Sequence, residues 1–293
     1  MPSIDEAESE RGALLGLCYR MLGTVADAED AVQETFVRWL RLSDAERAAI
    51  RNPAAWLTRV AGRICLDMLG SARARRERYV GEWLPEPVPG DSPLAAAAPV
   101  DPAERVTLDD SVSMALLVML ESLSPAERVA FVLHDVFGVP FAEIAETVGR
   151  TPDAVRQLAS QARRHVREQR AGAATRQEHD AVARAFAAAT TTGDLDALVS
   201  VLDPAVVLRS DGGRRVSAAR RPVHGADRVA RFLLGLPRLE PEAVIAPIET
   251  PDGMGFLATR DGEAIALLTL RVVAGRIADV YVMRNPDKLT QWG

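Results

Sequence analysis

The side chains best suited to recognising another molecule lie on a predicted helix that starts at Thr151 and continues to Arg170. Apolar residues recur along this helix at helical spacing and would be buried, which leaves arginine, glutamine and serine on the other faces. Arginine can bind a guanine edge through two hydrogen bonds, glutamine can bind adenine, and further cations can bind phosphates. The set predicted to bind DNA is Arg150, Thr151, Arg156, Gln157, Ser160, Arg163, Arg164 and Arg167.

Two shorter predicted helices precede this one and would position it. The first begins with a capping box at Ser124 and Glu127 and ends at Gly138, and the second ends at Gly149. Three helices in this arrangement are typical of a helix-turn-helix, whose last helix enters the major groove of DNA. The alternative is a structural bundle of three helices with a solvated basic face.

A second basic segment begins after Asn52, where helical spacing returns. Its arginines lie near a tryptophan, and aromatic rings beside cations are suited to contact with unstacked bases and their phosphates. The alternative for Trp56 is an ordinary core position. The predicted DNA-contacting residues of this segment are Trp56, Arg59, Arg63, Arg73, Arg75 and Arg76.

An acidic face is predicted on the second of two helices within residues 11–41, in the sequence DAEDAVQETFVRWL. Such a face is either ordinary solvated surface or a docking face for a basic partner protein, which complementary charge would steer and orient. The residues assigned to docking are Asp27, Asp30, Gln33, Glu34 and Phe36.

The composition indicates a globular protein of two or three domains. The chain has 293 residues, of which 48% are hydrophobic, and a formal net charge of −6. No apolar run approaches membrane-spanning length and the acidic N-terminus is unlike a signal peptide, so a cytoplasmic location is expected. Basic residues are concentrated in 51–80 and 149–176, so DNA contact should be local to these segments. The two cysteines lie in apolar helical patterns without ligand spacing, so we expect core positions and no metal or cofactor.

The last third of the chain has a different character. Helical patterns at 179–192, 194–202 and 226–236 are followed by strand patterns, and Asp261-Gly262 and Ala274-Gly275 have the composition of hairpin turns. Helices followed by an antiparallel meander predict an α+β domain. Between the two basic segments, residues 81–102 are rich in proline, alanine and acidic residues and read as a linker. Trp83 has no core of its own there, so we expect it to dock on another domain.

Taken together, residues 11–80 and 109–170 resemble the two domains of a bacterial extracytoplasmic-function (ECF) RNA polymerase sigma factor. DAEDAVQETFVRWL is similar to the core-polymerase docking motif, NPAAWLTRVAGRICLDMLGSARAR to the promoter -10 segment, and the helix-turn-helix to the -35 reader. The resemblance implies a multidomain protein that binds the beta-prime and beta subunits of the polymerase core and promoter DNA, away from membranes. The implied domains are 1–85 (sigma domain 2), 86–108 (acidic linker), 109–173 (sigma domain 4) and 178–293 (regulatory domain).

Residues 178–293 resemble a SnoaL-like cone, a fold of helices and a curved antiparallel sheet, and sigma factors with this extension form a subgroup. The resemblance implies that the extension tunes the activity of the sigma domains. Two departures from the family pattern concern Gly62-Arg63, where an Arg-Asn pair is common, and Arg214, where a further glycine is more usual. The residues assigned to regulation are Trp83, Leu84, Pro85, Asp211, Gly212, Gly213, Asn285, Pro286, Asp287, Lys288 and Leu289.

Two other classes of function stay open for the C-terminal domain. One is a stand-alone transcriptional regulator whose cone binds a small molecule. The other is a DNA-tethered enzyme, which would need titratable groups to converge from Asp211, His224, Arg209 and Arg214. A histidine in a tight turn and an Asp-Gly-Gly sequence are more typical of structure than of catalysis, so we expect no enzymatic activity.

Overall fold

The computed structural model describes residues 8–77, 79, 81–94 and 112–293. The chain divides into two compact units, each with its own core. The helical unit comprises Met1–Glu77, Asp91–Val112 and Leu116–Gln169, and the α+β unit comprises Arg78–Gly90, Ser113–Ala115 and Arg170–Gly293. The linker residues before Asp91 therefore belong to the α+β unit, although they directly follow the first helices of the chain.

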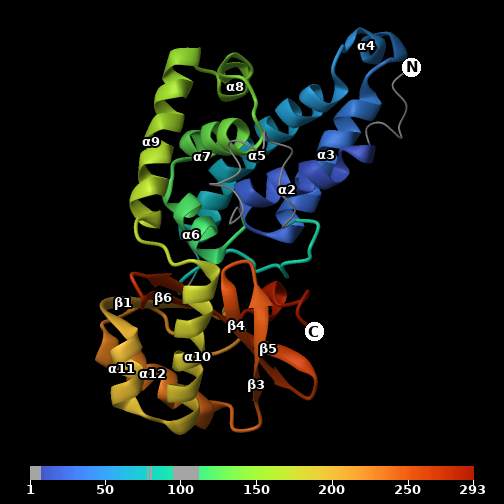
Figure 1. Cartoon of the computed structure of the whole chain (residues 1–293). Coiled ribbons are helices and arrows are strands. Elements are labelled where there is room, and N and C mark those ends of the chain that lie inside the picture. The colour runs from blue at the N-terminus through green and yellow to red at the C-terminus, as the bar shows by residue number, and fades with distance from the viewer. Residues whose placement is uncertain (1–7, 78, 80, 95–111) are drawn as a thin grey trace. The chain divides into compact units, whose positions relative to one another are not determined.

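The first half of the helical unit is a bundle of helices (Figure 1), and several of them begin at polar caps. The Thr24 hydroxyl accepts a hydrogen bond from the Asp27 amide, and Ser43 and Glu46 form a capping box. Cys18 and Cys65 are buried and free, which confirms their predicted core positions. The helices are α2 (Arg11–Leu22), α3 (Val25–Arg41), α4 (Asp44–Ala49) and α5 (Pro53–Glu77).

The second half of the helical unit contains the predicted helix-turn-helix. Ser124 and Glu127 form the predicted capping box, and Gly138 and Gly149 have left-handed backbone conformations after the helices that they follow. The first of these helices continues into a π-helical turn. The elements are α6 (Met114–Ser122), α7 (Pro125–Phe131), η2 (Val132–Val136), α8 (Phe141–Val148) and α9 (Pro152–Arg170).

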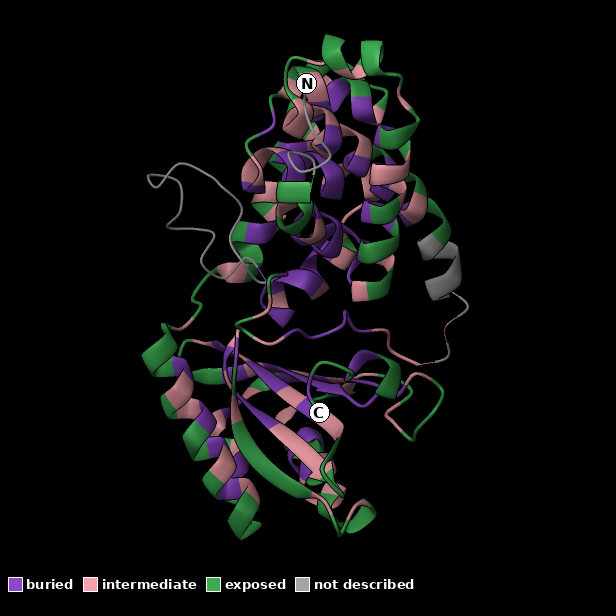
Figure 2. Cartoon of the chain, turned by 90° about the vertical axis from the view of Figure 1, so that its right-hand side faces the viewer, coloured by how far each residue is buried: buried purple, intermediate pink, exposed green. Residues whose placement is uncertain are grey.

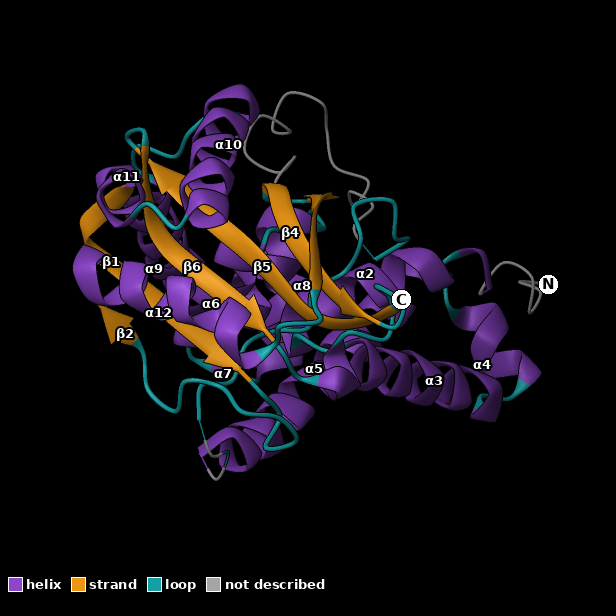
Figure 3. Cartoon of the chain, turned by 90° about the horizontal axis from the view of Figure 1, so that it is seen from below, coloured by secondary structure: helices purple, strands orange, loops and turns teal. Residues whose placement is uncertain are grey.

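The α+β unit consists of three helices against one face of a six-stranded sheet (Figure 3). The strand order is β2-β1-β6-β5-β4-β3. Side chains of the facing helices and strands fill the space between the two layers, among them Phe186, Leu233 and Phe256. The elements are α10 (Arg176–Thr192), α11 (Leu195–Val201), β1 (Leu202–Asp211), β2 (Val223–His224), α12 (Ala226–Leu239), β3 (Val244–Thr250), β4 (Gly253–Arg260), β5 (Glu263–Val273), β6 (Arg276–Met283) and the short 3₁₀ helix η3 (Pro286–Lys288).

The sheet is mixed rather than wholly antiparallel. Strands β3 to β6 form the predicted antiparallel meander, but β1 pairs in parallel with β6. After β1 the chain passes through β2 and α12 to the far edge of the sheet, where it forms β3. The strands β4, β5 and β6 then follow one another back across the sheet, so that β6 lies beside β1. The short strand β2, which carried no pattern in the sequence, pairs antiparallel with β1.

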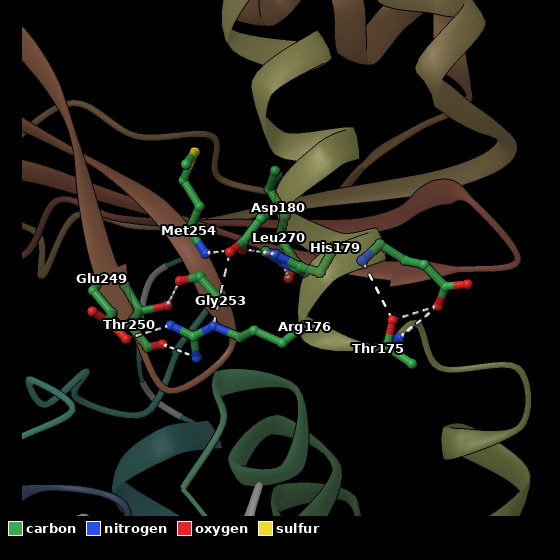
Figure 4. A network of polar contacts seen from close by, with 10 residues as sticks. Thr175, Arg176, His179, Asp180, Glu249, Thr250, Gly253, Met254 and Leu270 are labelled. Atoms are coloured by element: carbon green, nitrogen blue, oxygen red, sulfur yellow. Dashed lines mark hydrogen bonds and ion pairs between the residues drawn. The ribbon is translucent and has the colours of Figure 1, made fainter.

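A polar network fastens the start of α10 to the β3–β4 hairpin (Figure 4). Arg176 donates to the Thr250 carbonyl at 3.1 Å, and the Asp180 carboxylate accepts from the Met254 amide at 2.8 Å. The His179 ring lies against the hairpin where Gly253 has a φ of 123°, and a Cβ at that position would overlap the ring. A glycine is therefore required at this close approach.

Candidate functional site

Helix α9 presents most of its predicted DNA-binding side chains to solvent. Thr151 caps the helix by accepting a hydrogen bond from the Ala154 amide. Arg156 forms an ion pair with Asp153 at 2.5 Å and lies over the Phe141 ring, 5.4 Å from its centroid. Both contacts hold the guanidinium near the N-terminal end of the helix. The exposed residues of the predicted set are Arg150, Thr151, Arg156, Gln157, Ser160, Arg164 and Arg167.

Arg163 differs from the rest of this set. It is half-buried and forms an ion pair with Asp135 of η2 at 3.1 Å. The pair joins α9 to the preceding helix, so the guanidinium is already engaged inside the helix-turn-helix. Spacing alone did not reveal this, because Arg163 lies beside the buried stripe and Asp135 is far from it in the chain.

The basic side chains of α5 that the structure describes contact α8 of the same unit. Arg59 lies 3.4 Å from Glu146 and 3.8 Å from Glu143, and Arg63 donates to the Thr147 carbonyl at 2.9 Å. Two of the predicted -10 contacts are therefore occupied by the helix-turn-helix. The side chains of Arg73, Arg75 and Arg76 lie outside the described part of the chain.

Helix α5 packs against η2 at Gly62 and against α3 at Trp56. A Cβ at Gly62 would lie 3.1 Å from Leu133, so the glycine lets α5 approach η2 closely. The Trp56 ring is half-buried and lies 5.3 Å from the buried Trp39 ring. Trp56 thus contributes to the core while part of its ring stays accessible.

The acidic face of α3 is arranged as the sequence indicated. Asp30 and Gln33 are exposed, Phe36 is half-buried, and Glu34 forms an ion pair with Arg38 at 2.9 Å. Asp27 accepts a hydrogen bond from the Thr24 hydroxyl at 2.8 Å and so also helps to start the helix. Carboxylates in the first turn are favourable next to the positive end of the helix dipole.

In the α+β unit, the linker is bound by the end of β1. Asp211 is fully buried, and its carboxylate accepts hydrogen bonds from the Tyr79 hydroxyl, the Leu84 amide at 3.1 Å and the Gly213 amide at 2.9 Å. The Lys288 ammonium, 2.8 Å away, completes the set and also donates to the Leu84 carbonyl at 2.5 Å. A buried carboxylate with this many donors is electrostatically satisfied.

Aromatic residues enclose this ion pair. The Lys288 ammonium lies 4.2 Å from the centroid of the Trp83 ring, and the Trp292 indole donates to the Pro87 carbonyl at 2.9 Å. Burial and the hydrogen bond to Asp211 raise the pKa of Tyr79 above its ordinary value. We refer to Tyr79, Trp83, Leu84, Asp211, Lys288 and Trp292 as the linker clasp. The extended stretch 84–88 beside it is buried along its whole length (Figure 2).

The remaining residues assigned to regulation lie next to the clasp. Asn285 caps the turn at η3 by accepting from the Asp287 amide, and a Cβ at Gly213 would overlap its side chain. Leu289 and Pro85 are buried, whereas Asp287 forms an exposed ion pair with Arg215 at 3.3 Å. The three short motifs at 83–85, 211–213 and 285–289, which are distant in the chain, thus meet at the linker clasp. Sequence reasoning missed Tyr79 and Trp292, which carry no motif of their own.

Two of the four residues considered for catalysis, Asp211 and Arg209, are engaged in other contacts. Both carboxylate oxygens of Asp211 accept hydrogen bonds from the clasp, and Arg209 forms an ion pair with Asp279 at 2.7 Å. His224 and Arg214 are exposed. Within the described residues, no group of three or more histidine, cysteine, aspartate or glutamate side chains is arranged to hold a metal ion. None of the helices described combines the length and the apolar character that crossing a bilayer requires.

A further contact that the sequence did not indicate involves Asp252, in the turn between β3 and β4. Its carboxylate accepts hydrogen bonds from the Met114 amide at 2.8 Å and the Ala115 amide at 3.3 Å. These amides open α6 and have no partner within their own helix, so Asp252 acts as a cap supplied from more than a hundred residues away.

Comparisons with known proteins cover both units. The family model for Sigma-70 region 2 matches residues 7–75, and that for Sigma-70, region 4 matches residues 113–166. The chain is 41% identical over 305 residues to the ECF RNA polymerase sigma factor SigJ of Mycobacterium tuberculosis (strain ATCC 25618 / H37Rv), over 98% of this chain and 93% of SigJ. It is also 41% identical over 284 residues to the probable ECF RNA polymerase sigma factor SigI of Mycobacterium tuberculosis (strain CDC 1551 / Oshkosh), over 96% of this chain and 92% of SigI. The crystal structure of Mycobacterium tuberculosis SigJ has a TM-score of 0.73 and 38% identity and covers 99% of each chain.

Proposed function

This chain belongs to the extracytoplasmic-function family of RNA polymerase sigma factors, and we propose that it binds the polymerase core and brings it to the -35 and -10 elements of its promoters. The observation that carries this proposal is the exposed polar and basic face at the N-terminal half of α9, within the segment that matches Sigma-70 region 4. Polymerase is cytoplasmic, so the protein acts in the cytoplasm.

A different helix binds each of the two promoter elements. Helix α9 inserts into the major groove at the -35 element, where Arg156 and Gln157 contact base edges and Arg164 and Arg167 contact phosphates. Helix α5 contacts the -10 element through Trp56 and its arginines, where base stacking adds to charge neutralisation. The acidic face of α3 binds the core enzyme, because a negative face on the sigma factor suits a basic docking surface.

The contact between α5 and α8 keeps part of the -10 surface occupied in the free protein. Arg59 and Arg63 would have to give up their contacts with Glu143, Glu146 and the Thr147 carbonyl to bind DNA with their full set of donors. Core binding would therefore separate the two sigma regions and release these arginines. The ion pairs involved are partly exposed, so the cost of separating them is small compared with the gain from docking on polymerase.

The C-terminal domain tunes this activity through the linker clasp. The linker connects the two sigma regions, and the clasp holds it through a buried ion pair, an indole and a tyrosine of the same unit. While the linker is held, the spacing and orientation available to the two sigma regions are restricted. We propose no catalytic reaction for this domain, and the full hydrogen-bonding of the Asp211 carboxylate supports that view.

Run-off transcription with core polymerase tests the function. The full-length protein is compared with a chain cut after residue 175 and with a chain that lacks only residues 285–293. We expect transcription from the full-length protein, a changed yield after the first cut and a change in the other direction after the second. Failure to co-elute with core polymerase and to direct transcription would exclude the sigma function, and equal yields from all three chains would exclude tuning by the C-terminal domain.

A stand-alone regulator with a small-molecule-sensing domain is the second candidate function, and it is favoured by a cavity at the end of β1, described below. Such a regulator binds duplex promoter DNA without polymerase. A gel-shift assay with and without core enzyme separates the two functions, since a sigma factor requires the core for specific binding.

A further inference from the structure

A cavity of about 450 Å³ opens in the α+β unit beside the linker clasp. Its lining includes Gly81 of the linker, Ser210 and Gly212 at the end of β1, and Arg214, Ser217 and Arg220 of the following loop. This volume lies in the range of small-molecule sites. The space between the sheet and its helices is lined by apolar side chains, whereas this cavity at the edge of the domain is lined by arginines, serines and small residues.

The cavity carries positive charge that no side chain among the described residues neutralises. Arg214 and Arg220 are exposed, and within the described part of the chain neither guanidinium makes a hydrogen bond or an ion pair. The nearby cations differ in this respect, because Lys288 is paired with Asp211, Arg284 with Glu240 and Arg215 with Asp287. Two free guanidinium groups at a cavity suit a carboxylate or a phosphate, which arginine binds with two parallel hydrogen bonds.

The loop that holds these arginines has a constrained backbone. Gly213 and Arg214 both have left-handed conformations, with φ values of 63° and 61°. Arg214 is not a glycine, so this conformation is strained and has to be stabilised by the surrounding structure. A Cβ at Gly212 would lie 2.5 Å from the Val216 carbonyl oxygen, and the buried Arg284 donates to the Ser217 carbonyl at 2.8 Å. The loop is thus held in shape before any ligand arrives.

From these observations we infer that the cavity binds a small organic anion with a carboxylate or phosphate group, and that the anion strengthens the linker clasp. The ligand lies between Gly81 of the linker and the loop after Asp211, so it contacts both sides of the clasp. Gly81, Ala218 and Ala219 are small lining residues, which leave room for a small molecule at the cavity. This inference rests on the proposed function, because it supplies the signal for tuning by the C-terminal domain.

Binding is tested on the full-length protein by isothermal titration calorimetry at constant ionic strength in chloride. Inorganic pyrophosphate and citrate serve as the phosphate and carboxylate probes. We expect saturable binding of at least one probe and a loss of at least about tenfold in affinity for Arg214→Gly and for Arg220→Ala. Arg184→Ala removes the same charge from an exposed position of α10 that does not line the cavity, and should bind like the unmodified protein.

Arg214→Gly separates recognition from folding. Glycine adopts the left-handed conformation without strain, so this variant keeps the loop in place while it removes the guanidinium. Hydrogen exchange of residues 81–88 should slow when the probe binds the unmodified protein and should not respond in Arg214→Gly. The absence of saturable binding at millimolar probe, or equal losses for Arg214→Gly and Arg184→Ala, would overturn the inference.

Run-off transcription distinguishes the failure of this inference from the failure of the sigma function. The probe is added at the same concentration and the same free Mg²⁺ to the unmodified protein and to Arg214→Gly, because pyrophosphate and citrate also act on polymerase directly. We expect the probe to change run-off transcription by the unmodified protein relative to Arg214→Gly, in the direction opposite to Asp211→Asn, which weakens the clasp. Transcription that is intact but insensitive to the probe rejects the ligand and leaves the sigma function standing. Absence of transcription from the unmodified protein rejects the function itself. If duplex DNA competes with the probe for the unmodified protein but not for Arg220→Ala, the loop is a DNA contact. That result would overturn the small-molecule site.

Discussion

Asp211 lies at the centre of the linker clasp, where it accepts hydrogen bonds from the linker, from Gly213 of its own loop and from Lys288. Its carboxylate is fully buried, and the Lys288 side chain that neutralises it is only 8% exposed. An ion pair removed from water depends on both partners, because either charge left alone would be poorly solvated. Asp287 of the same motif forms an ion pair with Arg215 in which both side chains are more than half exposed, and solvent screens that pair.

Replacing Asp211 by asparagine should therefore destabilise the α+β unit strongly. The loss expected for breaking a buried pair is about 3 to 5 kcal/mol, whereas Asp287→Asn should cost about 0 to 1 kcal/mol. Urea unfolding measures the free energy of unfolding, and hydrogen exchange at the Leu84 amide reports the clasp itself. Similar stabilities for the two variants would contradict the buried role of Asp211.

We expect the exposed residues of α9 to divide by what they contact on DNA. Replacing Arg156 or Gln157 by alanine should cost about 1 to 3 kcal/mol at the cognate -35 site and relax the preference there, because we propose that these side chains contact base edges. Replacing Arg167 should weaken binding to all sequences and lower the salt dependence, because phosphates are the same in every sequence. Holoenzyme binding to cognate and scrambled -35 sites measures both effects. Equal losses on the two sites for Arg156→Ala would remove its base-reading role.

Asp180 makes the stability of the α+β unit depend on pH in the acid range. Burial by itself would raise the pKa of Asp180, but the Met254 amide, His179 and the charge of Arg176 together lower this pKa below its ordinary value. The carboxylate of the unfolded chain has a pKa of about 3.9. The stabilisation is therefore complete above that pH and is lost as the pH falls through the lower pKa of the folded protein.

Urea unfolding at a series of acid pH values checks this expectation. The loss of stability on acidification should be smaller in Asp180→Asn than in the unmodified protein, because the variant has no carboxylate to protonate. Asp203→Asn is the control, since this aspartate accepts a hydrogen bond from the Ala205 amide of its own strand and does not belong to the network at α10. Identical pH profiles for Asp180→Asn and the unmodified protein would count against the network at the start of α10.

At the scale of elements, the contact between α5 and α8 couples the two sigma regions. The double change Glu143→Lys and Glu146→Lys places like charges opposite Arg59, whose guanidinium lies 3.4 Å from Glu146. Repulsion should open the contact and expose the basic side chains of α5. We expect the free protein to bind single-stranded -10 DNA a few fold more tightly, since each exposed pair is worth about 0.2 to 1 kcal/mol.

Fluorescence anisotropy with a labelled -10 oligonucleotide measures this binding. Two added lysines also attract DNA without opening any contact, so Glu29→Lys with Asp30→Lys on the exposed face of α3 is the matched control. An equal increase in affinity for both double variants would mean that the added charge, and not the opening of α5, is responsible.

At the scale of the whole molecule, the chain joins DNA-reading helices to a domain that holds their linker. The helical unit contains both segments that match the sigma regions, and the α+β unit contains residues 78–90 of the connection between them. Any ligand or substitution that changes the clasp thus acts on the connection itself. The two truncations described above test this relation in transcription. The cut after residue 175 removes Asp211, Lys288 and Trp292 of the clasp, whereas the loss of residues 285–293 removes Lys288 and Trp292 but leaves Asp211.

Local signals in the sequence predicted much of the secondary structure and the main motifs. The capping box at Ser124, the glycines at 138 and 149 and the cap at Thr151 were all correct, because a cap and its helix lie within one turn of each other. Segregation of charge also located the acidic face of α3 and the basic face of α9. The helix α4 and the strand β2 were missed, since both are short and carry little periodicity.

By itself the sequence thus determined the helices, the hairpins and the order of the three sigma motifs, since these depend on neighbours a few residues apart. Only the tertiary structure decided that Arg163 is engaged by Asp135, that β1 pairs in parallel with β6, and that Tyr79 and Lys288 meet on Asp211. Tyr79 is 132 residues from Asp211 and Lys288 is 77 residues from it. Contacts between residues so far apart in the chain form only when the packing of the whole domain offsets the entropy lost in closing the chain between them.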